Sequence, residues 1–253
     1  MPLVGSLSVD GKLFSAVLIG PQHVLTAAHV VAGSAPEKVV FRTPLAGALV
    51  VPAQWIWVNP AYTGKASDKF PGDPTVHADI AVVRLAKEVP AVLRAAPVWT
   101  GPITGRLVTL VSHGGSTTLI TSGVNRVDAV FTGSQGQKAT YLFDFDGPDL
   151  GSNALGPAHP ANGSLGAGRE ASLVSGDSGS AAFVFEDGEW HLAGINTFEL
   201  RIGRNRGAGG VVLASHRHWI EEALAAQRPT AASPKANPLG TEAALPPNVP
   251  FKP

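Results

Sequence analysis

The chain has 253 residues and no net charge, since 19 lysines and arginines balance 19 aspartates and glutamates. Hydrophobic residues make up 44% of it, which supplies a core for one large or two small domains and excludes wholesale disorder. The neutral charge gives no electrostatic basis for binding nucleic acid or an anionic membrane, the lack of cysteine excludes disulfides and thiol chemistry, and no apolar run is long enough to cross a bilayer.

Residues 1–100 predict a first set of short strands. The high glycine and proline content suits many short strands joined by turns. In chain order, strands are expected over residues 3–8, 13–19, 24–26, 38–42, 48–51, 54–58 and 80–85. A polar loop over residues 59–75 comes before the last strand, and the prolines and glycines of residues 90–105 predict a crossing into a second half.

Residues 101–226 predict a second set of strands followed by one helix. The strands are expected over residues 107–111, 127–132, 140–145, 181–185, 190–197 and 208–212. An amphipathic pattern predicts a helix over residues 215–226 with Ser215 as its N-cap. About six strands in each half fit a pair of small antiparallel β-barrels, which is an all-β fold. Residues 227–253 are rich in proline and predict a flexible tail.

Three residues are candidates for nucleophilic catalysis. Gly176 and Gly179 flank Ser178, which leaves space beside its hydroxyl and lets the N–H groups of Gly176 and Ser178 converge on an oxyanion. A serine hydroxyl is a poor nucleophile without a general base, and that base needs an acid to orient it. His29 is the candidate base and Asp79, directly before an apolar strand, is the candidate acid.

The segments that carry these residues resemble the signature segments of a known family. Thr26-Ala27-Ala28-His29, Asp79-Ile80-Ala81-Val82-Val83-Arg84-Leu85 and Gly176-Asp177-Ser178-Gly179, in this order, resemble those of the chymotrypsin/trypsin family of serine proteases. The order differs from that of the α/β-hydrolases, in which the serine comes first. The resemblance implies a chymotrypsin-like fold, with two six-stranded antiparallel β-barrels and a C-terminal helix. The lack of cysteine is typical of bacterial members rather than animal digestive ones.

The resemblance also implies a substrate pocket beside the serine. Ser172 is expected at its floor, and a neutral floor predicts medium-sized apolar residues before the scissile bond. Glu199 stands where the family commonly has glycine, so that its side chain would narrow the pocket or favour basic residues. Thr197 is expected to add a hydrogen bond to Asp79. The expected substrate-binding residues are Ser172, Thr197, Phe198, Glu199 and Gly210.

Asp177 requires a partner of its own. In the family, a newly cut N-terminus inserts beside the aspartate that precedes the catalytic serine. Here the strand expected over residues 3–8 matches a stretch downstream of that N-terminus. Because a buried unpaired carboxylate is costly, we hypothesise that Asp177 pairs within the chain and that activation needs no cleavage. Ser180 replaces the family's usual glycine, which is a mild change.

A short acidic stretch is a candidate calcium site. Asp144, Asp146 and Asp149 place three carboxylates close together in the sequence. Their spacing does not match the EF-hand loop and Pro148 interrupts it, so an ordinary acidic turn is favoured. The triad implies no metal and no organic cofactor.

The sequence therefore predicts a serine endopeptidase with a protein or peptide substrate, expected as a monomer and secreted or periplasmic. Residues 1–6 lack a signal-peptide pattern, so either a signal has been removed or the protein stays inside the cell. Two alternatives stay open. One is a catalytically latent protease-fold module for binding or adhesion, and the other is an intracellular protease activated by a partner.

Overall fold

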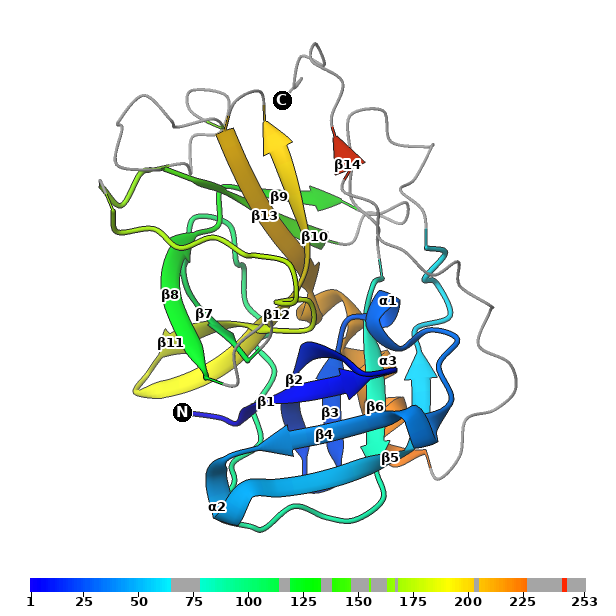
Figure 1. Cartoon of the computed structure of the whole chain (residues 1–253). Coiled ribbons are helices and arrows are strands. Elements are labelled where there is room, and N and C mark those ends of the chain that lie inside the picture. The colour runs from blue at the N-terminus through cyan, green and yellow to red at the C-terminus, as the bar shows by residue number, and fades with distance from the viewer. Residues whose placement is uncertain are drawn as a thin grey trace.

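The computed structural model describes residues 1–64, 78–113, 119–132, 138–146, 155, 163–166, 168–202, 205–226 and 243–244. These residues form two groups of mainly antiparallel strands, one from each half of the chain. In Figure 1 the blue-to-cyan strands of the first half lie below the green-to-yellow strands of the second. Within this part of the chain, no helix has the length and apolar character needed to span a membrane.

The first group closes into a six-stranded barrel with the order β1-β2-β3-β6-β5-β4. Its strands are β1 (Val4–Val9), β2 (Lys12–Gly20), β3 (His23–Thr26), β4 (Val39–Thr43), β5 (Leu49–Val58) and β6 (Ala81–Leu85). Apolar residues at alternate positions turn inward, and the fully buried Leu7, Leu25 and Phe41 help to fill the interior. This closed barrel confirms the expectation for the first half.

The strands expected over residues 48–51 and 54–58 form one strand, β5. Pro52 interrupts the apolar pattern in the sequence, but its side chain is exposed. The strand continues past it, with an irregular register against β6 between Ala53 and Trp55. Pro52 keeps its place in the register opposite Val40 of β4, and its carbonyl accepts the Ala86 N–H at 2.9 Å.

Short helical elements also interrupt the first half. The helix α1 (Ala28–Val31) is a single turn that begins two residues after β3, and it was not predicted. The 3-10 helix η1 (Pro36–Lys38) leads into β4. The segment labelled α2 (Leu45–Ala48) is a tight turn between β4 and β5, in which Ala46 and Gly47 have left-handed backbone angles.

The second group is a sheet with the strand order β8-β7-β11-β12-β13-β10-β9. Its strands are β7 (Leu107–Ser112), β8 (Thr121–Arg126), β9 (Ala129–Thr132), β10 (Lys138–Phe145), β11 (Ala181–Glu186), β12 (Glu189–Ile202) and β13 (Asn205–Val212). β14 (Ala243–Ala244) pairs in parallel with β12. The predicted flexible tail over residues 227–253 otherwise lies outside the described residues.

The predicted all-β class with two strand groups is confirmed, although the order of the second group contains seven strands where six were expected. The strand that the sequence missed is β8, in which Val124 is the single apolar residue. Its backbone pairs with β7 along the whole strand. Asn125, which is buried, donates its side-chain amide to the carbonyl groups of Asp144 and Ala171, both at 2.8 Å. Hydrogen bonds rather than apolar alternation therefore hold this strand.

The C-terminal helix starts later than predicted. The chain leaves β13 through the 3-10 helix η4 (Leu213–His216) and enters α3 (Arg217–Ala225), which lies against β6 of the first barrel (Figure 1). The N-cap is His216 and no side chain caps the helix, so the predicted capping by Ser215 is wrong. The buried Leu213 holds the 3-10 turn, and this turn keeps Ser215 ahead of the helix.

One hydrophobic cluster joins the two halves. It contains the interior of the first barrel and continues through Phe183 of β11 and Ile195 of β12 to Ile220 of α3. A second cluster gathers around Tyr141 and Phe143 inside the second half. Because strands of both halves bury side chains in the first cluster, the positions of the two halves depend on each other.

We predict that Phe41→Ala lowers the free energy of unfolding by about 3–5 kcal/mol, because Phe41 is fully buried and its removal leaves a cavity. The matched control is Phe185→Ala. Phe185 is 54% exposed, so its loss should cost about 1 kcal/mol or less. Denaturant unfolding measures both values. Equal losses in the two variants would contradict the assignment of Phe41 to a barrel core that carries the stability.

Candidate active site

Ser178 lies in a loop that two glycines shape, shortly before β11. The N–H of Asp177 donates to the Val174 carbonyl at 2.9 Å, which closes a tight turn with Gly176 at φ +97°. Gly179 has φ +82°, and a Cβ there would collide with the Ser15 carbonyl oxygen and the Thr26 hydroxyl. Both positions require glycine, because side chains disfavour this backbone region and Gly179 also has no space for one.

His29 and Asp79 come from the first barrel and meet directly. His29 is presented by α1, and Asp79 lies just before β6. The Asp79 carboxylate accepts two hydrogen bonds from His29, one from the backbone N–H at 2.8 Å and one from Nδ1 at 2.7 Å. The backbone bond fixes the carboxylate relative to the helical turn, and the second bond fixes the ring.

Ser178 completes the arrangement from the second half. The other ring nitrogen of His29, Nε2, lies 2.9 Å from Ser178 Oγ. Because Asp79 occupies Nδ1 as an acceptor, Nδ1 carries the proton and Nε2 is the acceptor for the serine hydroxyl. The structure therefore brings together the three residues that the sequence singled out, at distances that allow proton transfer.

Burial and charge act against each other at His29. Burial of the ring acts to lower the pKa of His29, but the negative charge and the hydrogen bond of Asp79 outweigh it, so that the pKa is raised. The Asp79 side chain is 6% exposed and that of His29 is 22% exposed. Burial, and then the charge of Asp79, also raises the pKa of the Tyr62 hydroxyl. Tyr62 is therefore a buried neighbour of the acid.

The predicted hydrogen bond from Thr197 to Asp79 is wrong. The Thr197 hydroxyl is buried and has no hydrogen-bond partner among the described residues. β12 has an irregular register against β13 between Asn196 and Phe198, at the position of Thr197. Such a bulge changes the direction of the side chain that it carries, which the sequence pattern does not reveal.

The N–H groups expected to form an oxyanion hole are available. Among the described residues, neither Gly176 N–H nor Ser178 N–H donates to a protein acceptor. The neighbouring N–H groups are used: Gly179 donates to the Asn196 carbonyl and Ser180 donates to the Asp177 carbonyl, both at 2.9 Å. The loop is thus held by its other donors, while these two are left without an acceptor.

Asp177 is paired within the chain, which confirms that part of the hypothesis. One carboxylate oxygen accepts the Ser112 hydroxyl at 2.5 Å, and the other accepts the Val174 N–H at 2.8 Å. Ser112 Oγ also lies 3.2 Å from Ser15 Oγ, which in turn accepts the His113 N–H at 2.9 Å. Since the single Ser112 proton goes to Asp177, the Ser15 hydroxyl must donate to Ser112. A chain of hydrogen bonds therefore runs from β2 through β7 to Asp177.

The residues expected to bind substrate come from segments before and after the serine loop in the sequence. The N–H of Asn196 donates to the Ser180 carbonyl at 2.9 Å, and Thr197, Phe198 and Glu199 follow along β12. Gly210 of β13 is the register partner of Asn196, and a Cβ there would collide with the Ile195 carbonyl oxygen, so close strand pairing alone requires glycine. Ser172 precedes the serine loop and follows Ala171, whose N–H donates to the Val124 carbonyl of β8 at 2.8 Å.

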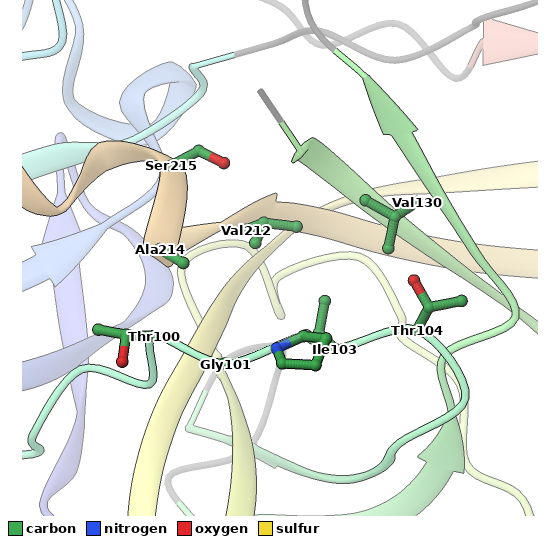
Figure 2. Close-up of a pocket in the computed structure, with 9 residues that line it drawn as sticks. Thr100, Gly101, Ile103, Thr104, Val130, Val212, Ala214 and Ser215 are labelled. Carbon is green, nitrogen blue, oxygen red and sulfur yellow. The ribbon is translucent and has the colours of Figure 1, made fainter. Parts of the chain in front are cut away.

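The structure also contains a separate apolar cavity of about 300 Å³ (Figure 2). Its lining comes from the crossing segment between the halves, from β9 and from the end of β13 with η4. The lining residues are Thr100, Gly101, Pro102, Ile103, Thr104, Val130, Val212, Ala214 and Ser215. No member of the triad and no residue of the expected substrate pocket lines this cavity.

Sequence reasoning missed Tyr62, Ser15 and Ser112. Tyr62 lies in a stretch that reads as a polar loop, yet it is 5% exposed. Ser15 lies inside the apolar strand β2 and Ser112 is the last residue of β7, and at such positions a buried hydroxyl signals that a hydrogen-bond partner is required. That signal was present in the sequence, but it names no partner.

The two strand groups and the hydrogen-bonded serine, histidine and aspartate define a protein of the chymotrypsin-like protease fold. A sequence model of the trypsin family, described as Trypsin, matches residues 1–220, and the chain belongs to that family. No curated protein sequence matches the chain.

Solved structures show the same fold. The scabies mite inactivated protease paralogue S-D1 is similar over 90% of this chain and 94% of its own, with 12% identity and a TM-score of 0.62. The scabies mite inactivated protease paralogue S-I1 is similar over 88% of this chain and 93% of its own, with 17% identity and a TM-score of 0.58. At these identities the similarity concerns the fold alone.

We predict that Asp79→Asn lowers the pKa of His29, because burial of the ring then acts without the opposing negative charge. In the wild type, the stability that the raised pKa contributes is present below the pKa of the unfolded state and is lost as pH rises through the folded value. An NMR titration of the assigned His29 ring measures the pKa in both proteins. Asp187→Asn, at an exposed hairpin turn, is the control. An unchanged His29 pKa in Asp79→Asn would contradict the ion pair.

We predict that Ser112→Ala lowers the free energy of unfolding by about 1–3 kcal/mol, because it leaves a buried oxygen of Asp177 without its donor. The control is Ser34→Ala. It removes a hydroxyl that donates to Asp10 at an exposed site, where water replaces the lost bond, so its effect should stay within about 0.5 kcal/mol. Chemical denaturation compares the two. If Ser112→Ala lowers the free energy of unfolding no more than Ser34→Ala does, the stabilising hydrogen bond from Ser112 to Asp177 is contradicted.

Proposed function

We propose that this chain is a serine endopeptidase that cleaves peptide bonds through an acyl-enzyme. The observation that carries the proposal is the pair of hydrogen bonds made by His29, at 2.7 Å to Asp79 and at 2.9 Å to Ser178. All three residues of a nucleophile, base and acid set are present, in the arrangement that activates a serine hydroxyl. Membership of the trypsin family supports the reaction class.

The protonation states of Ser178 and His29 determine the first half of the reaction. Ser178 Oγ attacks the peptide carbonyl carbon while its proton moves to His29 Nε2, and the carbonyl π electrons move to the oxygen. Asp79 stabilises the imidazolium that results. His29 then gives the same proton to the leaving amine, the C–N bond breaks, and the acyl group remains on Ser178. Water attacks this ester in the second half, with His29 again accepting and returning a proton.

The charge on the carbonyl oxygen needs its own stabilisation. The N–H groups of Gly176 and Ser178 are the donors we assign to it, since neither is used within the described part of the chain. Donors that are already oriented stabilise the charge as it develops, without a cost of reorganisation during the step. The bonds from Ser112 and Val174 to Asp177 hold the loop between these two groups.

An extended peptide is the substrate form that the strands support. The register pairs of β12 with β11 end at Ile195, and those with β14 begin at Leu200. Between them, a substrate strand can add to the edge of β12 at Thr197 to Glu199, which gives affinity through backbone hydrogen bonds. The neutral Ser172 at the expected pocket floor favours medium-sized apolar residues before the scissile bond.

A catalytically latent module is the second candidate, because the two similar structures described above are of proteins described as inactivated protease paralogues. Against it stand the intact set of His29, Asp79 and Ser178 and their hydrogen bonds. A latent protein with this triad would need a further defect, in the oxyanion loop or in the pocket.

We predict that a fluorophosphonate probe labels the wild type, as Ser178 Oγ displaces fluoride from phosphorus. Labelling should vanish in Ser178→Ala, and peptide hydrolysis should fall by about 10⁴-fold or more. The matched control is Ser175→Ala, an exposed serine in the same loop, which should keep the label. Gel fluorescence and intact mass measure both. Label retained in Ser178→Ala would contradict the assigned nucleophile, and folded wild type without label would favour the latent module.

A further inference from the structure

Acidic side chains gather at the end of β10, away from the triad. Asp144 is the penultimate residue of β10, and Asp146 directly follows the strand. Glu170 comes from the stretch that leads to the serine loop. One oxygen from each of the three carboxylates lies within 4.8 Å of the others. Asp144 is 2% exposed and Asp146 is 3% exposed, which an ordinary acidic surface turn would not require. Asp149, the third carboxylate of the sequence hypothesis, lies outside the described residues.

Backbone N–H groups hold most of these carboxylates in place. Glu170 accepts the Leu165 N–H at 2.9 Å with one oxygen and the Asp146 N–H at 2.7 Å with the other. Asp144 accepts the Leu155 N–H at 2.9 Å. Among the ion pairs of the described residues, none gives Asp146 or Glu170 a lysine, arginine or histidine partner. The site is therefore organised, and no cationic side chain of the described residues pairs with Asp146 or Glu170.

Asp146 points most directly to a missing ligand. Both of its carboxylate oxygens are buried, and neither has a hydrogen-bond partner within the described part of the chain. A buried ionised carboxylate without partners is strongly unfavourable, so native proteins pair such groups or use them to coordinate a metal. The backbone N–H of the same residue is already bonded to Glu170, which keeps the carboxylate inside the cluster.

We propose that Asp144, Asp146 and Glu170 bind a calcium ion. Carboxylate oxygens are the preferred ligands of hard cations, and no sulfur or imidazole ligand belongs to the group. Calcium accepts oxygens at about 2.3–2.6 Å, so two ligands on opposite sides of the ion lie about 5 Å apart, which accommodates the 4.8 Å limit of this cluster. Magnesium forms bonds of about 2.0–2.1 Å and requires nearly octahedral coordination, so it would need the carboxylate oxygens to lie closer together.

The ion would connect two parts of the second half. Asp144 and Asp146 belong to the end of β10, and Glu170 stands two residues before Ser172 in the segment that continues to Ser178. Calcium therefore fastens the approach to the serine loop without taking part in the chemistry of the triad.

The test is calcium binding to the full-length protein after chelator treatment, followed by titration calorimetry and thermal unfolding. We expect saturable binding of one ion at this site and a rise in Tm with calcium, because a ligand that binds only the folded state stabilises it. Asp146→Asn should weaken calcium binding by at least about tenfold, since affinity depends on the number of charged ligands. Glu170→Gln is the second variant, in case Asp146→Asn does not fold.

The control is Asp187→Asn, which removes an exposed carboxylate at a left-handed position that asparagine also tolerates, and it should keep wild-type calcium affinity. Without calcium, Asp146→Asn should be at least as stable as the wild type, because it removes a buried repulsive charge. Absence of saturable calcium binding by the wild type would overturn the proposal and leave protons to neutralise the cluster. Unchanged calcium affinity in both Asp146→Asn and Glu170→Gln, or equal affinity for magnesium, would overturn it as well.

Discussion

The geometry of the site depends on one contact, where β2 of the first barrel touches the loop that carries Ser178. The Ser15 N–H donates to the Ser178 carbonyl at 3.0 Å, and the Ser15 carbonyl accepts the Thr26 hydroxyl at 2.8 Å. Gly179 lies so close to both that any side chain would force the two halves apart. Since His29 belongs to one half and Ser178 to the other, this contact sets the distance between base and nucleophile.

Two buried carboxylates on either side of this contact are satisfied by hydrogen bonds. Asp79 accepts two donors from His29, and Asp177 accepts one from Ser112 and one from Val174. In each case one donor is a backbone N–H, which cannot rotate away, and the other is a side chain from a distant part of the chain. The same physical requirement, that a buried charge must be met by partners, leads to the calcium proposal at Asp146, where no such donor is found in the described residues.

The shared hydrophobic cluster explains why hydrogen bonds of this kind can be kept at fixed lengths. Side chains of the first barrel, of β11 and β12, and of α3 pack in one continuous group. Close-packed interiors resist small displacements, so the loop around Ser178 is carried by a rigid support rather than by its own contacts alone. The chain belongs to the trypsin family, and the two similar mite proteins are described as inactivated. Because active and inactive proteins share this fold, catalytic activity is the property to measure first.

The sequence by itself determined the features whose causes are local. The sequence marks the residues of the site by the glycines at 176 and 179, by the aspartate directly before an apolar strand and by the histidine after a short strand. Apolar alternation marks most of the strands. It did not determine β8, the start of α3 or the direction of Thr197, because pairing with β7, the burial of Leu213 and a bulge in β12 decide these. The bond from Ser112 to Asp177, the closeness of Tyr62 to Asp79 and the meeting of Glu170 with Asp146 join residues that are distant along the chain. Only the folded arrangement selects such partners, since the sequence shows that a buried polar group needs one but does not say which.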